Sequence, residues 1–223
     1  MTLILLIETA TKSCSVSLAS DDKIIATKQQ VNEQYSHAEK LTVFITELFK
    51  NQDFTIQDLD AIAVSKGPGS YTGLRIGTST AKGICYAIDK PLISISTLKA
   101  MAFGMTQKEK SDLYCPMIDA RRMEVYNAFY NSSNKEIRGV QADIITKESY
   151  EKELEQKVLF FGDGANKCKE IIKHSNAKFI EEIYPSSKDM VALSMQKYAN
   201  KDFEDVAYFE PFYLKDFVAG KKA

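Results

Sequence analysis

Two short apolar segments, each ending in an acidic residue, begin the two halves of this chain. The first covers residues 3–8 and ends in Glu8, and the second covers residues 114–119 and ends in Asp119. Each is followed by a polar turn and two further apolar segments, at nearly the same separations. Such self-similarity predicts that one supersecondary unit occurs twice, so the chain should fold as two related lobes.

Hydrophobic periodicity predicts the elements of each half. In the first half it favours a three-stranded meander (3–8, 14–19 and 24–29), a helix (37–49), a buried strand (61–65), a second helix (72–88) and a further strand (92–95). In the second half it predicts three strands (114–119, 125–130 and a segment toward Ile145), a short fourth strand (158–161) and two helices (166–173 and 188–199). The charged run 147–157 is typical of a solvated helical face.

Two meanders followed by helices, with parallel connections, are typical of the duplicated ribonuclease-H-like fold found in actin, sugar kinases and heat-shock ATPases. We therefore predict an α/β chain of this actin-like (ASKHA) class, with two subdomains, mixed sheets and flanking helices. A polar stretch near residues 108–112 marks the boundary. Residues 1–108 would form the N-terminal subdomain with the partner interface, 109–204 a degraded C-terminal subdomain, and 205–223 a segment that packs back on the first.

Charge and composition exclude several classes of function. The 223 residues are 44% hydrophobic and carry a formal net charge of −1, with Lys and Arg spread along the chain rather than gathered into a basic patch. Any contact with RNA is therefore expected to run through a partner. The first apolar run is too short for a signal peptide or a membrane span, so we expect a cytoplasmic protein that does not bind membranes. The four cysteines form no Cys-x-x-Cys pair, which argues against a zinc or redox motif.

The two strand-end acids are the first candidates for chemistry. In a nucleotide-hydrolysing protein of this fold, acids at these tips hold the metal, and glycine-rich turns let backbone N–H groups approach the phosphates. Neither the turn after Glu8 nor the turn after Asp119 contains glycine. We therefore expect no metal or cofactor on this chain alone, and both acids should bind N–H groups of their own turns. An ATPase or small-molecule kinase of the same superfamily remains the alternative.

A glycine-rich loop, Gly67-Pro68-Gly69-Ser70, opens directly onto the second predicted helix. Free N–H groups at a helix N-terminus can receive an anion. A structural role is the other reading: the glycines provide special backbone geometry, and Ser70 or Thr72 caps the helix. If the loop binds an anion or nucleotide, the contacting residues are expected near this loop or near the second strand end. They are Gly67, Gly69, Ser70, Arg75, Asp119 and Arg121.

The second predicted helix carries two non-polar stripes, so it must be covered on both sides. One stripe can dock on the sheet of its own domain, and the stripe of small residues permits close approach of another subunit. The first predicted helix also carries an apolar stripe. The predicted partner interface combines these stripes and comprises His37, Leu41, Phe44, Ile45, Leu48, Gly73, Ile76, Thr80, Gly83 and Ala87. The alternative is that both stripes are internal core contacts.

Four segments resemble the TsaB family, also called YeaZ, strongest over residues 3–130. They read ILLIET at 4–9, GPGSYTGLRIG at 67–77, DARRMEVY at 119–126 and PFYLK at 211–215. The glycine string also suits the catalytic sister TsaD, which carries a helical His-x-x-x-His metal pair. Here the second ligand position is Leu41, so the resemblance implies no metal. The chain departs from the family pattern at Glu8, where aspartate is usual, and at Lys215, where arginine is common.

The resemblance implies a non-catalytic scaffold and activator subunit that pairs with TsaD, and with the ATPase TsaE in a complex. ATP and Mg²⁺ would be bound in that complex, which transfers a threonylcarbamoyl group to adenosine 37 of tRNA. The isolated chain would be a homodimer through the same helices. A standalone homodimer with an unrelated regulatory partner is a third reading.

Overall fold

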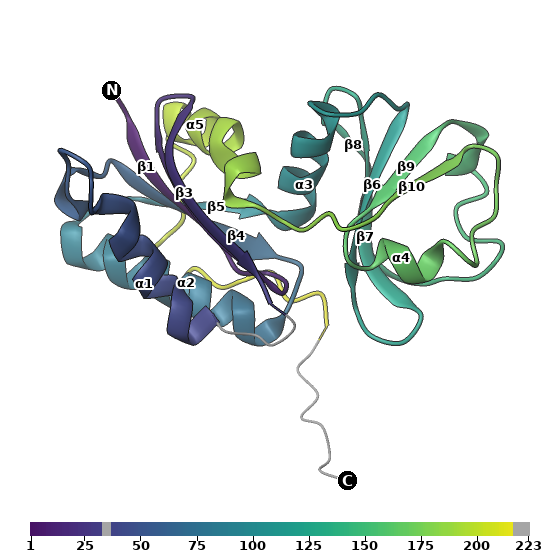
Figure 1. The fold of residues 1–223 in the computed structure, drawn as a ribbon, viewed down its shortest axis with the longest axis horizontal. Helices are drawn as coiled ribbons and strands as arrows, with labels where there is room; N and C mark the ends of the chain where they lie inside the picture. The colour runs from purple at the N-terminus through teal and green to yellow at the C-terminus, as the bar shows by residue number, and fades with distance from the viewer. Residues whose placement is uncertain (33–36, 216–223) are drawn as a thin grey trace, which may run out of the picture.

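The computed structural model describes residues 1–32 and 37–215, which form two lobes side by side, each built on a five-stranded sheet (Figure 1). The first sheet has the order β3-β2-β1-β4-β5 and the second the order β8-β7-β6-β9-β10. Strand bounds are β1 Leu3–Glu8, β2 Ser13–Ser20, β3 Lys23–Val31, β4 Ala61–Gly67, β5 Leu92–Ser96, β6 Leu113–Asp119, β7 Glu124–Asn131, β8 Glu136–Ile144, β9 Val158–Phe161 and β10 Ala177–Ile180.

The internal repeat is confirmed by the strand pairing. β1 pairs antiparallel with β2 and parallel with β4, and β6 pairs antiparallel with β7 and parallel with β9. Glu8 and Asp119 therefore end equivalent central strands. The predicted fold class, a duplicated actin-like α/β fold with two mixed sheets, is the one observed.

Helices cover both faces of the first sheet. α1 (His37–Phe49) and α2 (Tyr71–Ile88) lie together on one face, with the short 3₁₀ helix η1 (Ile56–Asp58) between α1 and β4. On the other face, η3 (Ser187–Met190) and α5 (Val191–Ala199) pack against Ile4 and Leu6 of β1. We expected these last two elements in the second subdomain; their apolar side chains instead complete the core of the first lobe.

A helix that was not predicted, α3 (Thr97–Thr106), lies between the two lobes. Leu98 and Met105 pack with residues of the second sheet, whereas Ala100 packs with the first. Its buried residues thus face both sheets, which leaves no single apolar stripe to indicate a helix.

The far face of the second sheet is covered by short elements: η2 (Glu153–Glu155) and α4 (Ala165–Cys168). The expected solvated helix at 147–157 is wrong. This segment forms turns and η2, because Tyr150 and Leu154 are buried against the sheet as anchors. The helix expected at 166–173 is shortened to α4, and β10 was not predicted.

After α5 the chain returns to the first lobe. Glu204 forms a β-bridge with Leu92, and Val206 and Phe209 pack on the core beside α2. The predicted return of 205–223 is thus observed as far as residue 215, and 216–223 lie outside the described residues. No helix within residues 1–32 and 37–215 combines the length and apolar character needed to cross a membrane.

Candidate functional site

The first strand tip is closed by contacts within the protein. The Glu8 side chain is fully buried; its Oε1 accepts the backbone N–H of Ala10 at 2.6 Å and the Ser65 hydroxyl at 2.9 Å. Its Oε2 has no hydrogen-bond partner among the described residues. Burial raises the pKa of Glu8 to about 7, and these hydrogen bonds only partly oppose the rise. The predicted turn-capping role is confirmed.

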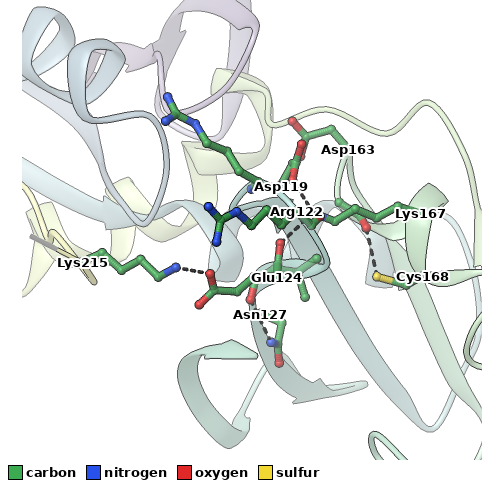
Figure 2. A network of polar contacts seen from close by, with 11 residues as sticks. Asp119, Arg122, Glu124, Asn127, Asp163, Lys167, Cys168 and Lys215 are labelled. Carbon is green, nitrogen blue, oxygen red and sulfur yellow. Dashed lines mark hydrogen bonds and ion pairs between the residues drawn. The ribbon is translucent and has the colours of Figure 1, made fainter. Parts of the chain in front are cut away.

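The second strand tip is held by a lysine. Asp119 Oδ1 accepts the backbone N–H of Arg121 at 2.8 Å and also pairs with the ammonium of Lys167 (Figure 2). Lys167 lies in α4 and donates as well to the carbonyls of Arg122 and Glu124, each at 2.7 Å. One ammonium therefore closes the turn between β6 and β7, and the Asp119 carboxylate is engaged in structure.

The glycine-rich loop after β4 is pressed against the Glu8 turn. The N–H of Ser70 donates to the carbonyl of Ala10 at 2.7 Å, and a Cβ added to Gly69 would lie 2.3 Å from that oxygen. Gly67 has φ +106°, a conformation that favours glycine. Ser70 is the N-cap of α2 and accepts the N–H of Gly73. The structural reading of this loop is therefore supported at each predicted position.

The second lobe repeats this arrangement, which the sequence analysis missed. Gly162-Asp163-Gly164 follows β9, the counterpart of β4, and Gly162 has φ +110°. A Cβ on Gly164 would lie 3.0 Å from the backbone N of Asp119, as Gly69 lies against the first turn. Burial raises the pKa of Asp163, whose Oδ1 accepts the N–H of Asp119 at 3.1 Å. The signal was a Gly-x-Gly after an apolar strand in both halves.

The six residues predicted to contact an anion fall into two groups on different lobes. Gly69 and Ser70 contact the Glu8 turn and Gly67 lies against Phe212 and Leu74, whereas Asp119 and Arg121 belong to the β6–β7 turn. Arg75 is exposed on α2, where its guanidinium lies 4.3 Å from the centre of the Tyr71 ring and its Nε donates to the Tyr213 hydroxyl at 3.4 Å.

ATP and Mg²⁺, which nucleotide-hydrolysing proteins of this fold class bind, do not fit the ends of β1 and β6. The glycine loop is packed directly against Ala10 of the first turn, whose carbonyl oxygen would lie 2.3 Å from a Cβ on Gly69. The Glu8 carboxyl is buried and hydrogen-bonded, and the Asp119 carboxylate is paired with Lys167. Within residues 1–32 and 37–215, no three His, Cys, Asp or Glu side chains are grouped to hold a metal ion.

Five residues of the predicted interface are buried within the first lobe itself. They are His37, Leu41, Ile45, Leu48 and Gly73. The three apolar side chains pack in the core between α1 and the sheet. The Nε2–H of His37 donates to the Thr11 carbonyl at 2.7 Å, and burial lowers the pKa of this imidazole. A Cβ on Gly73 would lie 2.2 Å from the Thr9 carbonyl oxygen.

On the outer side of α2, the predicted interface residues are exposed or half-buried. Gly83 and Ala87 are exposed, Ile76 and Thr80 are half-buried, and Phe44 of α1 is half-buried as well. A Cβ added to Gly83 would meet nothing within 4 Å, so the packing of this lobe gives no reason for glycine there. Within a helix such a glycine costs about 1 kcal/mol relative to alanine.

Two large exposed side chains extend this surface and were missed by the sequence analysis. Tyr86 of α2 is 87% exposed and Val43 of α1 is 47% exposed. Both lie on the sides of their helices that do not pack on the sheet, which is a signal that helical periodicity contains. We call the surface formed by Val43, Ile76, Thr80, Gly83, Tyr86 and Ala87 the outer helical face.

Comparison with known proteins places this architecture. The chain is 30% identical over 226 residues to the tRNA threonylcarbamoyladenosine biosynthesis protein TsaB of Escherichia coli, which covers 98% of this chain and 97% of the relative. The chain belongs to the TsaB family. The Bacillus subtilis TsaB is 32% identical over 174 residues, covering 76% of this chain and 75% of its own length.

Two further matches agree with the TsaB assignment. Residues 23–223 match the family model described as "TsaD: tRNA N6-adenosine threonylcarbamoyltransferase", so TsaB and TsaD chains share a wider family. The solved structure "YeaZ from Pseudomonas aeruginosa" superposes with a TM-score of 0.80 at 22% identity, covering 96% of this chain and all of that one. At this identity the superposition supports the fold.

Proposed function

We propose that this TsaB-family chain acts in the biosynthesis of threonylcarbamoyladenosine on tRNA as a scaffold and activator subunit that performs no bond chemistry itself. Its outer helical face would pair with a TsaD-type subunit, and a TsaE-type ATPase would join that pair. ATP and Mg²⁺ belong to the assembly, tRNA is reached through the partner, and the site of action is the cytoplasm.

The observation that carries this proposal is the exposed Gly83 in the middle of α2. Gly69 and Gly73 each lie too close to neighbouring backbone for a Cβ, whereas Gly83 has open space around it. A glycine that is unfavourable in its helix and unused by its own lobe is explained by close approach of a second helix, which small side chains permit. Tyr86 beside it is the kind of exposed aromatic that partner surfaces favour.

The closed strand tips support the non-catalytic part of the proposal. Each acid that would hold a metal in a nucleotide-hydrolysing relative is occupied by contacts of its own turn. Turnover of ATP by the purified chain, lost in Asp119→Asn, would favour the kinase or ATPase alternative instead.

The proposed pairing is tested by size-exclusion chromatography and titration calorimetry of the chain with a TsaD-type subunit. Gly83→Arg should abolish co-elution, because the long side chain blocks close helix approach. Gly83→Ala is the matched control and should retain measurable binding. Equal binding by both variants would show that the partner docks elsewhere, and the same variants tested without partner report whether a homodimer uses this face.

A further inference from the structure

The last described segment of the chain, residues 204–215, runs along the first lobe as an extended strap. It begins where the N–H of Glu204 donates to the Leu92 carbonyl at 2.9 Å, at the edge of the first sheet. It then passes α2, where the Lys82 ammonium donates to the carbonyls of Ala207 and Phe209 at 3.0 and 3.1 Å. We call this segment the C-terminal strap.

The strap reaches the glycine-rich loop and is fixed there. The N–H of Phe212 donates to the Lys66 carbonyl at 2.7 Å, so a backbone hydrogen bond ties the strap to the end of β4. Tyr213 lies against Tyr71 at the start of α2, with 4.8 Å between ring centroids. These contacts fix the strap to the first lobe from the β5 edge to the N-terminus of α2.

Lys215, two residues further on, crosses to the other lobe. Its ammonium pairs with the carboxylate of Glu124, the first residue of β7, and Figure 2 shows the two side chains extended toward each other. The contact lies beside the turn that Lys167 closes, and Lys167 itself binds the Glu124 carbonyl. A strap fixed to the first lobe therefore holds the strand-tip end of the second lobe.

From this course we infer that the C-terminal strap is a clamp between the lobes, with the ion pair between Lys215 and Glu124 as its releasable latch. Helix α3 contacts both sheets through buried apolar side chains, so the lobes are joined there whether or not the latch is formed. The latch is different: it is directional, and its side chains are 41% and 20% exposed, so water can replace it. This inference concerns the isolated chain and does not depend on the proposed partner.

The test measures the distance between the lobes. Spin labels are attached at Lys50→Cys, at the end of α1, and at Ser133→Cys, in the turn between β7 and β8; both positions are exposed. The four native cysteines are buried, so the labels go to the introduced thiols. Double electron–electron resonance then gives the distance distribution of the whole chain.

We expect Lys215→Glu to broaden this distribution and to raise the population outside the original peak by about two- to fivefold, the range for a partly exposed ion pair. Glu124→Lys should do the same. The double variant with the charges exchanged should restore the original peak. Lys147→Glu, an exposed lysine of the second lobe outside the strap's contacts, is the control and should change nothing.

Two results would overturn the inference. One is an unchanged distribution in Lys215→Glu, which would mean that the lobes are held without the latch. The other is a broadening that the exchanged pair does not reverse, which would assign the effect to something other than the ion pair. Circular dichroism of each variant establishes that both lobes are folded.

Discussion

Glu8 makes the stability of this chain depend on pH in a direction opposite to that of most acidic residues. Its pKa is about 7 in the folded protein against 4.5 in the reference state, because its carboxyl is buried. Between these two values the folded state keeps a proton that the unfolded state has released. The contribution of Glu8 to stability is therefore fully present below pH 4.5 and is lost as pH rises through 7. The difference of about 2.5 units corresponds to roughly 3 kcal/mol.

Glu8→Gln isolates this contribution. The glutamine carbonyl can still accept from Ala10 and Ser65, and the side chain has no charge at any pH. We expect the free energy of unfolding of the variant, minus that of the natural protein, to rise by roughly 3 kcal/mol between pH 4.5 and 8. The comparison is made by urea denaturation at half-unit steps.

The subtraction removes groups that titrate equally in both proteins. His37, whose pKa is lowered by burial, contributes stability that is lost as pH falls below its unfolded value, so it opposes Glu8 in the natural protein but cancels in the difference. A flat difference for Glu8→Gln would refute the reasoning, because Glu8 would then be charged in the folded state at pH 5.

Three further substitutions test particular contacts by urea denaturation. Gly83→Ala should raise the free energy of unfolding of the isolated chain by up to about 1 kcal/mol, since the new methyl group meets nothing within 4 Å; a loss of stability would contradict this. Gly69→Ala should lower it by about 1–3 kcal/mol, because its Cβ would lie 2.3 Å from the Ala10 carbonyl oxygen; unchanged stability would mean that the loop moves freely. Lys167→Met should cost about 1–3 kcal/mol, because it removes the charged donor shared by the carbonyls of Arg122 and Glu124. The control Lys169→Met removes an exposed pair and should cost less than about 1 kcal/mol; equal costs would contradict the role of Lys167.

The central strands of both sheets could be predicted from the sequence because they are continuous apolar runs bounded by polar turns. The duplication followed from the matching positions of Glu8 and Asp119. By contrast, α3 was missed because it packs on two sheets and so lacks a single apolar stripe. The second Gly-x-Gly turn was missed because it lies at a different separation from its strand-end acid, and only the strand pairing makes Gly162 the counterpart of Gly67.

Half of the predicted interface residues are buried in the first lobe, for a physical reason. A helix that docks on its own sheet and a helix that docks on a partner have the same 3.6-residue pattern, so periodicity alone did not separate them. On α1 the predicted stripe, including Leu41 and Ile45, is the core itself. On α2 the pattern held two stripes, and the structure assigns Gly73 to internal contact and leaves Gly83 exposed.

The most direct test of the central claim is the rate of threonylcarbamoyl transfer to tRNA in a reconstituted system that contains TsaD-type and TsaE-type subunits and threonylcarbamoyl-adenylate. If this chain acts through its outer helical face and not through its strand tips, Asp119→Asn should support transfer at close to the natural rate, and Gly83→Arg should not support it. Loss of transfer with Asp119→Asn, together with full transfer by Gly83→Arg, would contradict the account.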